Sequence, residues 1–347
     1  MCNFLSIFVD FILFRQRVNY ISKQSLFMKK YVGLLLLLII FSVGYAQDHV
    51  VKHWEYDING KNGIACRYVQ SRNLLFMSGF SIADNDVFYF AGGKPLSVVC
   101  FKGTKKMYER VIDALPTKLS MFKVVKDSVY LVNDQNLTLY RMHKSGQGPV
   151  DKVKLNVGKL RPCEGAMQES GFVLIQRIGQ PLHANYKAIY FNDSGRLIKK
   201  EDIENKDNVM CNSSECKKIL DSYLYPSAKL VFPGFDGNYK GTWNGYNIFW
   251  GLFGNSEKAS WTLVFADKDG KVAKHYDINY HLNDMYDVIP LPVLTNDIDP
   301  ETFTTAPTYC MLHGENLYIL GYSGAKKKII LCRINLLNAF NSEQSAK

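Results

Sequence analysis

The sequence lacks any recognisable catalytic or cofactor-binding signature. It has no His-Glu-x-x-His zinc motif, and its histidines form no metal-binding pattern. Three short stretches resemble known motifs but each lacks a residue that the motif requires. Gly321 to Ala325 has Ala where a nucleophile elbow needs Gly. Asp267 to Gly270 lacks the later ligands of a calcium loop, and Gly146 to Gly148 lacks the Lys of a phosphate-binding loop. We interpret all three as turns and expect no metal and no cofactor.

Helical patterning and concentrated charge are also scarce. The one amphipathic helix that the pattern predicts spans residues 213–224. The formal net charge is +10, and it falls to +6 without residues 1–46, which hold five Lys or Arg and one acidic residue. The lysine pairs are scattered along the chain rather than gathered in one basic stretch. This distribution indicates a solvated surface and argues against a nucleic-acid partner.

The cysteines exclude a fully paired disulfide scaffold. The chain has eight, and Cys2 leaves with the N-terminal segment discussed below, so an odd number remains. Cys100 and Cys332 lie in apolar, β-rich runs, which predicts small buried side chains. Cys211 and Cys216, in the polar stretch "CNSSEC", are candidates for a local disulfide.

A secretion signal begins inside the chain rather than at its start. Residues 28–46 combine two lysines, an apolar run of thirteen residues and a small residue, Ala46, at the expected cleavage position. The run is shorter than the roughly 20 residues that a membrane-spanning helix needs. We interpret residues 1–27 as an over-extended start, residues 28–46 as a signal peptide and residues 47–347 as the mature domain. The alternative is an uncleaved membrane anchor. Cleavage near Ala46 predicts a periplasmic or extracellular protein.

The mature chain contains a repeated all-β unit, in which a polar turn leads into a dense apolar strand. The unit recurs in "DNDVFYF", "KDSVYLV", "ESGFVLI", "WNGYNIFW" and "GENLYIL". Taking Val87, Val129, Phe172, Asn247 and Leu317 as equivalent positions, the first two spacings of 42 and 43 residues match a four-stranded propeller blade. The later spacings, 75 and 70, predict insertions or further blades, and residues 204–245 form the largest insertion.

A charged strand follows a hairpin in several repeats, as in "MHKSGQGPVDKVKL", "YFNDSGRLIKKEDI" and "FADKDGKVAKHYDI". Such strands suit the exposed outer edge of a blade. The last repeat lacks one, and residues 50–58 at the mature N-terminus supply a similar strand. We therefore expect a β-propeller of five to seven four-stranded blades, closed into a ring by its N-terminal strand.

The Asp-x-Asp-Gly and Asn-Asp-Ser-Gly turns, the Gly146-Gln147-Gly148-Pro149 stretch and the single export signal together resemble bacterial exported six-bladed propellers of the TolB-like kind. The resemblance spans most of residues 50–335. It implies six blades and a broad role in binding, and it carries over no catalytic residue.

One segment is unusually aromatic. Between Tyr223 and Trp261 there are eleven aromatic residues in 39, where the chain average of 13% predicts about five. Rigid aromatic faces next to Gly and Asn suit stacking on a sugar ring or docking of a peptide. Core packing between blades is the alternative. We expect Tyr239, Trp243 and Tyr246, on the more polar side, to be exposed and to bind a ligand.

These observations favour an exported, non-catalytic binding module with a glycan or protein ligand. One alternative is a propeller glycoside hydrolase or lyase acting on extracellular polysaccharide, for which Asp84, Asp86, Glu164 and Asp236 lie near predicted strand ends. Another is a scaffold in an envelope protein complex. A membrane is expected only through the signal segment, if it remains uncleaved.

Overall fold

The chain divides into two units, residues 1–50 and 51–347. A computed structural model describes residues 51–342 of the second unit, apart from 66, 70–73, 77–78, 85, 94, 115–118, 134–135, 158–161, 179–184, 204–224, 226–227, 255–259, 278–287, 290–309 and 324–325. The expected signal peptide, the helix at 213–224 and the Cys211–Cys216 pair all lie outside the described residues.

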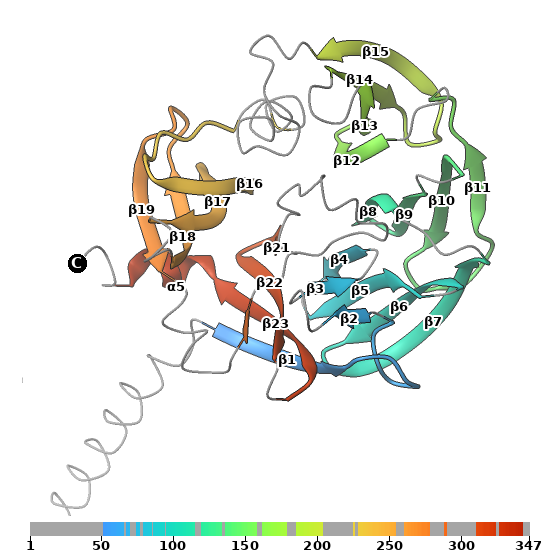
Figure 1. Ribbon diagram of the computed structural model, residues 1–347, viewed down its shortest axis with the longest axis horizontal. Helices are drawn as coiled ribbons and strands as arrows, with labels where there is room; N and C mark the ends of the chain where they lie inside the picture. The colour runs from blue at the N-terminus through green and yellow to red at the C-terminus, as the bar shows by residue number, and fades with distance from the viewer. Residues whose placement is uncertain are drawn as a thin grey trace, which may run out of the picture. The chain divides into compact units, whose positions relative to one another are not determined.

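The described residues form five antiparallel sheets arranged as the blades of a β-propeller (Figure 1). From the inner to the outer strand, blade 1 comprises β4 (Gly79–Asp84), β5 (Val87–Gly92), β6 (Leu96–Lys102) and β7 (Lys105–Asp113). Blade 2 comprises β8 (Leu119–Val125), β9 (Ser128–Asn133), β10 (Thr138–His143) and β11 (Asp151–Lys154). Blade 3 comprises β12 (Pro162–Gln168), β13 (Gly171–Ile178), β14 (Asn185–Phe191) and β15 (Leu197–Ile203).

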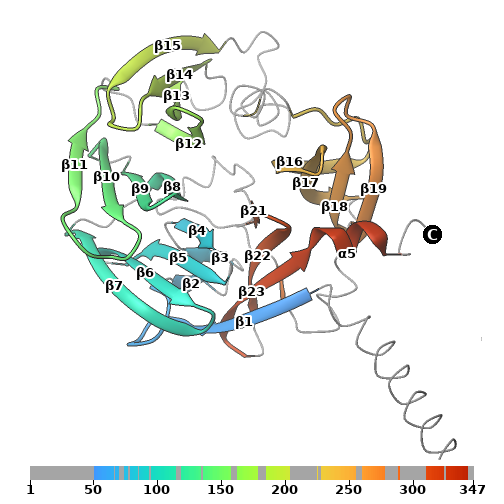
Figure 2. The same ribbon diagram turned by 180° about the vertical axis from the view of Figure 1, so that it is seen from behind.

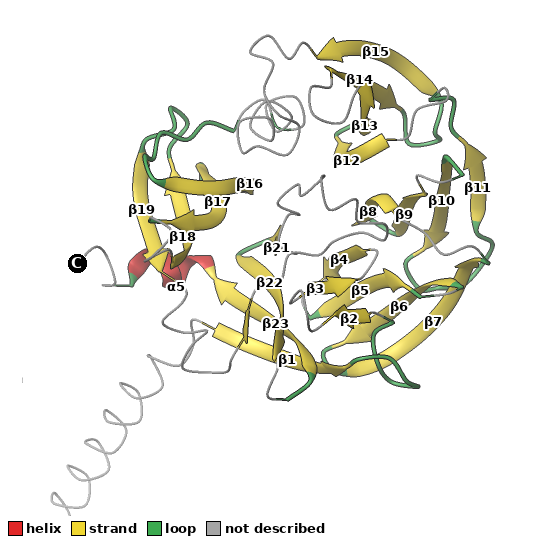
Figure 3. Ribbon diagram, in the orientation of Figure 1, coloured by secondary structure: helices red, strands yellow, loops and turns green. Residues whose placement is uncertain are grey.

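The last two blades differ in how their inner strands are built. Blade 4 comprises β16 (Phe235–Trp243), β17 (Tyr246–Phe253), β18 (Ser260–Ala266) and β19 (Val272–Asp277). Blade 5 comprises β20 (Val288–Ile289) and β21 (Cys310–His313), which both pair with β22 (Asn316–Ser323), followed by β23 (Lys328–Asn335) and β1 (Val51–Asp57). A short pair, β2 (Arg67–Val69) and β3 (Leu74–Phe76), forms a separate two-stranded sheet. Helix α5 (Leu336–Asn341) follows β23, and it is the helix coloured red in Figure 3.

The position of a strand within its blade explains its composition. The middle strands are covered on both faces by neighbouring blades, and their apolar side chains are buried almost without interruption, as in β6. The outer strands alternate charged and apolar residues, as in β7. The predicted outer strands after the hairpins are β11, β15 and β19, which confirms their expected place at the blade edges.

The apolar core lies between successive blades. One cluster joins Tyr89 and Val98 of blade 1 to Val129 of blade 2, and a second joins Val132 of blade 2 to Phe172 of blade 3. A third joins blade 5 to blade 1. Cys100 and Cys332 are buried in this apolar interior, as predicted. Two further clusters lie within blade 3 and blade 4. Shared apolar clusters therefore join blades 5, 1, 2 and 3 in order around the ring.

The N-terminal strand closes the ring, as the sequence predicted. β1 pairs antiparallel with β23 from Val51–Ile334 to Asp57–Lys328, which makes it the outer strand of blade 5 (Figure 2). Trp54 and Tyr56 bury their side chains in the cluster shared by blades 5 and 1. The Tyr56 hydroxyl donates to the Gly103 carbonyl of blade 1.

Asp86 forms ion pairs at the same junction between blade 5 and blade 1. It lies in the β4–β5 turn of blade 1, with a positive φ of 63°. Its carboxylate contacts the Lys52 amine of β1 and the Arg333 guanidinium of β23, each at 3.0 Å. Both cations also lie over the ring of Trp54. One turn residue of blade 1 therefore contacts both β1 and β23 of blade 5.

The five equivalent positions that defined the repeat all lie at the start of the second strand of a blade, in β5, β9, β13, β17 and β22. The described residues thus form five blades, the number of plain repeats, and a sixth that the resemblance favoured is not among them. The range 204–245 expected as an insertion needs a correction at its C-terminal end. Residues Phe235–Trp243 are the inner strand β16, because they pair with β17 along their whole length.

The three motif-like stretches adopt hairpin or loop structure. The Asp267 side chain accepts hydrogen bonds from the amides of Asp269 and Lys271, which makes "DKDG" a tight turn rather than a cation loop. Gly321 lies inside β22, which pairs antiparallel with β23 from Asn316–Asn335 to Ser323–Lys328. Gly146 and Gly148 lie in the loop between β10 and β11.

Candidate functional site

The inner strand departs from regular pairing in four blades, at different places along the strand. The register shifts between Ile82 and Asp84 at the end of β4, at the start of β8 and of β12, and between Tyr239 and Gly241 inside β16. Each shift leaves one extra residue on the inner strand: Ala83, Ser120, Cys163 or Lys240. A bulge raises the local twist and re-aims a side chain. In β16 the extra residue carries a charge.

Ionisable side chains on the inner strands of four blades lie within electrostatic range of one another. Lys240 of β16 acts electrostatically on Lys123 of β8, although blade 3 separates their blades. Lys123 acts in turn on His313 of β21, across blade 1, and Asp84 of β4 also acts on His313. Lys240 further acts on Cys310 of β21. Since groups on non-adjacent blades can meet only at the centre of the ring, we name these five residues the axial cluster.

The surroundings shift the protonation of three members of the axial cluster. Burial, with a smaller contribution from Lys240, lowers the pKa of Lys123 to about 8. Burial also lowers the pKa of His313; Asp84 opposes this shift and Lys123 adds to it. Burial raises the pKa of the Cys310 thiol to about 12. At neutral pH the cluster therefore has a charged Lys123 amine, an uncharged imidazole and a protonated thiol.

The carboxylate of the axial cluster pairs with a third amine, that of Lys144. Asp84 Oδ2 lies 3.6 Å from the Lys144 amine, and Lys144 lies 3.0 Å from Asp127 Oδ1. Within the described part of the chain, no carboxylate lies within ion-pair distance of the Lys123 amine.

Trp243 is not exposed, which corrects the sequence expectation. Its side chain is 5% exposed, packs against Phe265 and Phe340, and donates its indole N–H to the Glu315 carboxylate. Trp243 ends β16 on the face toward blade 5, and α5 supplies Phe340 to cover it. A buried indole satisfied by a carboxylate is a structural residue here.

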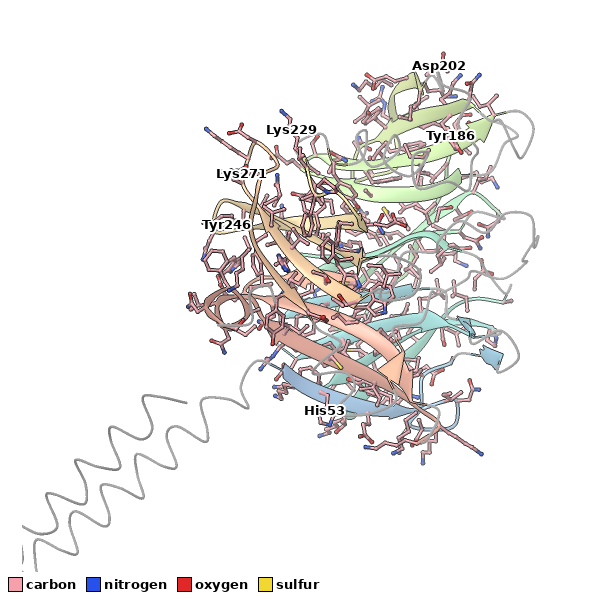
Figure 4. The ribbon with its side chains drawn as sticks, turned by 60° about the vertical axis from the view of Figure 1, so that its left-hand side comes forward. His53, Tyr186, Asp202, Lys229, Tyr246 and Lys271 are labelled. Atoms are coloured by element: carbon pink, nitrogen blue, oxygen red, sulfur yellow. The ribbon has the colours of Figure 1, made fainter. Side chains whose placement is uncertain are left out.

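Tyr239 and Tyr246 are both half-buried but lie in different places. The Tyr246 ring is 5.1 Å from Phe340 of α5, at the hairpin between β16 and β17, and Figure 4 labels its side chain at the edge of the molecule. The Tyr239 ring lies 5.3 Å from Tyr225 and 5.6 Å from Phe249. The expected three-residue surface is therefore not assembled.

The bulge at Lys240 explains why Tyr239 and Trp243 separate. A spacing of four along a regular strand would place both side chains on one face. The extra residue reverses the alternation, so Tyr239 pairs with Phe249 on one face and Trp243 pairs with Tyr246 on the other. Tyr239 directly precedes Lys240 and is thus the predicted aromatic residue that adjoins the axial cluster in sequence.

The acidic residues considered for glycoside hydrolysis are dispersed among the described residues. Asp84 belongs to the axial cluster, Asp86 is held by Lys52 and Arg333, and Asp236 is exposed in β16. The side chain of Glu164, in β12, lies outside the described part of the chain. Paired carboxylates are consequently not part of the site as described.

The sequence interpretation missed Lys123, Lys240 and His313. The available signal was a Lys or His side chain within each inner strand, in "SMFKVV", "NYKGTW" and "CMLHGE". Lys123, Lys240 and His313 lie four to seven residues before Val129, Asn247 and Leu317, the equivalent positions of their repeats. Comparing the inner strands of the repeats with one another, rather than looking for motifs, would have identified them.

The described residues contain neither a metal-binding cluster nor a membrane-spanning helix. No group of three or more His, Cys, Asp or Glu side chains among them could hold a metal ion. No described helix is both long and apolar enough to cross a membrane.

No protein-family model matches the chain, and no curated protein matches it. Solved structures align with most of its length at low similarity. Glutaminyl cyclase from Myxococcus xanthus is 7% identical, covers 83% of this chain and 96% of its own, and has a TM-score of 0.37. Virginiamycin B lyase from Staphylococcus aureus is 11% identical, with coverages of 82% and 99% and a TM-score of 0.36.

A third structure, beta-1,2-mannobiose phosphorylase from Listeria innocua, is 8% identical, with coverages of 84% and 83% and a TM-score of 0.32. Likenesses at these scores support no inference about function. The propeller fold rests instead on the strand pairing of this chain, and membership of the TolB-like group remains a prediction.

Proposed function

We propose that the protein is an exported β-propeller that acts as a non-catalytic binding module for a glycan and receives its ligand at the axial cluster. The observation that carries the proposal is the convergence of Lys123, Lys240, His313 and Asp84 from four blades. Strands of a rigid scaffold hold these groups, and a binding site needs such fixed geometry. The predicted signal peptide at residues 28–46 supports export.

The chemistry of the axial cluster favours binding over catalysis. The Cys310 thiol is protonated at neutral pH and therefore a poor nucleophile. Asp84 is shared with Lys144, and hydrolysis of a glycosidic bond needs a second carboxylate at a defined distance.

The small number of groups favours a glycan over a folded protein partner. A stable protein interface buries on the order of 1,000 Å² or more, with some 20 residues on each side. The axial cluster consists of five side chains, mostly half-buried in inner strands. A few polar groups in a fixed arrangement suit one or two sugar units.

The test is a thermal-shift screen of the purified protein against neutral and acidic oligosaccharides, with released reducing sugar assayed in the same samples. We expect a shift without product, and loss of that shift in Lys240→Met. Product release would instead support the hydrolase or lyase alternative. No shift with any saccharide would overturn the glycan proposal and favour a protein partner.

A further inference from the structure

We infer that Asn192, in the hairpin between β14 and β15, is an acceptor site for N-linked glycosylation of the folded protein. The donor is a sugar activated as a nucleotide diphosphate or a lipid diphosphate. This inference concerns a sugar attached covalently to the protein, so it does not depend on the ligand proposed above. Its evidence is the contrast between two Asn-x-Ser/Thr sequences that the structure describes.

The chain holds three Asn-x-Ser/Thr sequences, the pattern that N-glycosyltransferases modify, and they begin at Asn136, Asn192 and Asn212. Asn212 lies outside the described residues. Residues 192–194 lie at the rim of blade 3, where the chain enters the outer strand β15 (Figure 1). Asp193 and Ser194 are exposed, and Asn192 is half-buried. The hairpin therefore presents this sequence to solvent.

The hydrogen bonds of the Asn192 side chain all involve its oxygen. Oδ1 accepts from the Ser194 hydroxyl at 2.8 Å, from the Ser194 amide at 3.1 Å and from the Arg196 amide at 2.8 Å. Nδ2 has no hydrogen-bond partner among the described residues. The nitrogen that receives the sugar is therefore available, while the oxygen is held in place.

This arrangement suits the chemistry of the transfer. Nδ2 attacks C1 of the sugar, the C1–O bond to the diphosphate breaks, and the diphosphate leaves with the bonding electrons. The proton lost from Nδ2 passes to a base of the transferase. An amide nitrogen is a poor nucleophile until that proton leaves, and its departure moves negative charge onto Oδ1. Three donors at Oδ1 stabilise this charge, as the donors of an oxyanion hole do.

Asn136 has the opposite arrangement. Its Nδ2 donates to the Tyr140 hydroxyl at 2.8 Å and to Asp113 Oδ2 at 3.3 Å. The Thr138 hydroxyl donates to the backbone carbonyl of Asn136, at 3.1 Å, rather than to its side chain. Asn136 Oδ1 is buried and accepts no hydrogen bond within the described part of the chain. The nitrogen is occupied and the oxygen unsupported, so the fold should protect Asn136 from modification.

Gly195 fixes the turn that holds Asn192 and Ser194 together. It has a φ of 81°, and its amide donates to the Asn192 carbonyl at 2.9 Å. A Cβ atom at Gly195 would lie 3.1 Å from Val153 Cγ1 and 3.2 Å from Leu155 Cδ2, which follow β10 in blade 2. The turn is therefore packed against the neighbouring blade, and the contact between the Ser194 hydroxyl and Asn192 exists before a transferase binds.

The experiment incubates the purified full-length protein with UDP-glucose and a soluble transferase that glucosylates Asn-x-Ser/Thr sequences. Peptide mass spectrometry then locates and quantifies the product at each site. A tryptic digest treated in the same way gives the reactivity of each sequence without the fold. In the folded protein we expect Asn192 to react at least about tenfold faster than Asn136, because Asn136 must first break two hydrogen bonds. In the digest both should react at similar rates.

Variants test the preformed turn. Gly195→Ala should slow the reaction at Asn192 about tenfold in the folded protein, because it strains the turn, and should leave the digest unchanged. Gly148→Ala is the matched control: it has a φ of 78°, but a Cβ atom added there would meet no described atom within 4 Å, so neither rate should change. Ser194→Thr keeps the hydroxyl and should react like wild type, whereas Ser194→Ala should not react at Asn192.

The outcomes separate this inference from the proposed function. Equal rates at Asn192 and Asn136 in the folded protein would overturn it, and so would reaction of both sites in the digest but of neither in the folded protein. An unchanged rate in folded Gly195→Ala would overturn the role of the turn; if that variant does not fold, the wild-type comparison decides alone. A saccharide screen without any thermal shift would overturn the binding function and leave this site intact.

Discussion

At the residue scale, the axial cluster places charge where it reduces stability. Burial lowers the pKa of Lys123 below the value of a free lysine, which means that folding disfavours the charged amine. Natural proteins tolerate such costs chiefly at functional positions. A binding role and a purely structural role therefore predict opposite effects of a Lys123 substitution on the free energy of unfolding.

Lys123→Met should stabilise the protein at pH 7, by up to about 3 kcal/mol, because it removes a partly buried charge and keeps the chain length. The folded pKa of about 8 lies below that of the unfolded chain, so the unfolded state binds more protons between these two values. Wild-type stability should consequently rise with pH across this range, and the advantage of the variant should fade above about pH 10. Urea denaturation of wild type and Lys123→Met at pH 7 and pH 10.5 measures both the rise in wild-type stability and the loss of the variant's advantage. A Lys123→Met variant less stable than wild type at pH 7 would contradict the assigned environment.

Asp86 allows charge and backbone conformation to be tested separately. Asn tolerates the positive φ of 63° at this position, whereas Ala does not readily. Asp86→Asn should cost about 1 kcal/mol through loss of the Lys52 and Arg333 ion pairs, which are partly exposed. Asp86→Ala should cost about 1 kcal/mol more. Chemical denaturation in low and high salt checks this, because only the ionic part should shrink with salt. Equal stabilities of the two variants would exclude a backbone contribution.

At the scale of the element, the inner strand β16 combines a charged bulge with a close approach to its neighbour. Gly241 follows Lys240 and has a φ of 144°. A Cβ atom at this position would lie 2.7 Å from Leu312 Cδ2 of β21. The absence of a side chain at Gly241 therefore lets β16 and β21 approach beside the axial cluster.

Gly241→Ala should destabilise the protein by about 2 kcal/mol and weaken ligand binding at the axial cluster, because β16 must move away from β21. Gly245→Ala is the matched control: it also has a positive φ, 81°, but a Cβ atom added there would meet no described atom within 4 Å. The control should cost about 1 kcal/mol and leave binding unchanged. Thermal denaturation together with calorimetric titration distinguishes the two. A binding loss in Gly245→Ala equal to that in Gly241→Ala would show that the contact with Leu312 is not the cause.

At the scale of the whole molecule, ring closure depends on a strand from the opposite end of the chain. Deleting residues 50–58 should lower the melting temperature by on the order of 10 °C or more, because it removes the outer strand of blade 5 and uncovers the cluster shared with blade 1. Trp54→Ala alone should cost about 3 kcal/mol or more. Asp57→Ala, an exposed residue of the same strand, should change stability little. An unchanged melting temperature after the deletion would exclude closure by β1 as a source of stability.

The sequence predicted the ring better than the site. The period of 42–43 residues and the charged outer strands reflect burial, which acts on every blade alike and therefore repeats. The closing strand was predictable because one repeat lacked an outer strand that the N-terminus could supply. Trp243 was misplaced because its exposure depends on a bulge at Lys240, and a one-residue shift in pairing leaves no mark in composition.

The axial cluster was harder to predict for a related reason. Lys123, Lys240 and His313 lie far apart in the sequence and meet only because the blades form a ring. Each looks like an isolated polar residue in its own strand. Their joint chemistry depends on the closure of the ring, which no local pattern encodes.

The pairing of β1 with β23 also determines when the ring can close during synthesis of the chain. β1 is the first of the described strands to be synthesised, and its partner, Lys328–Asn335, is the last. A chain that is threaded across a membrane in the unfolded state cannot complete its ring until that final segment has passed through. Contacts so distant in sequence form slowly. Under the proposed export, late closure would keep the polypeptide open during transport and delay its final folding until after translocation.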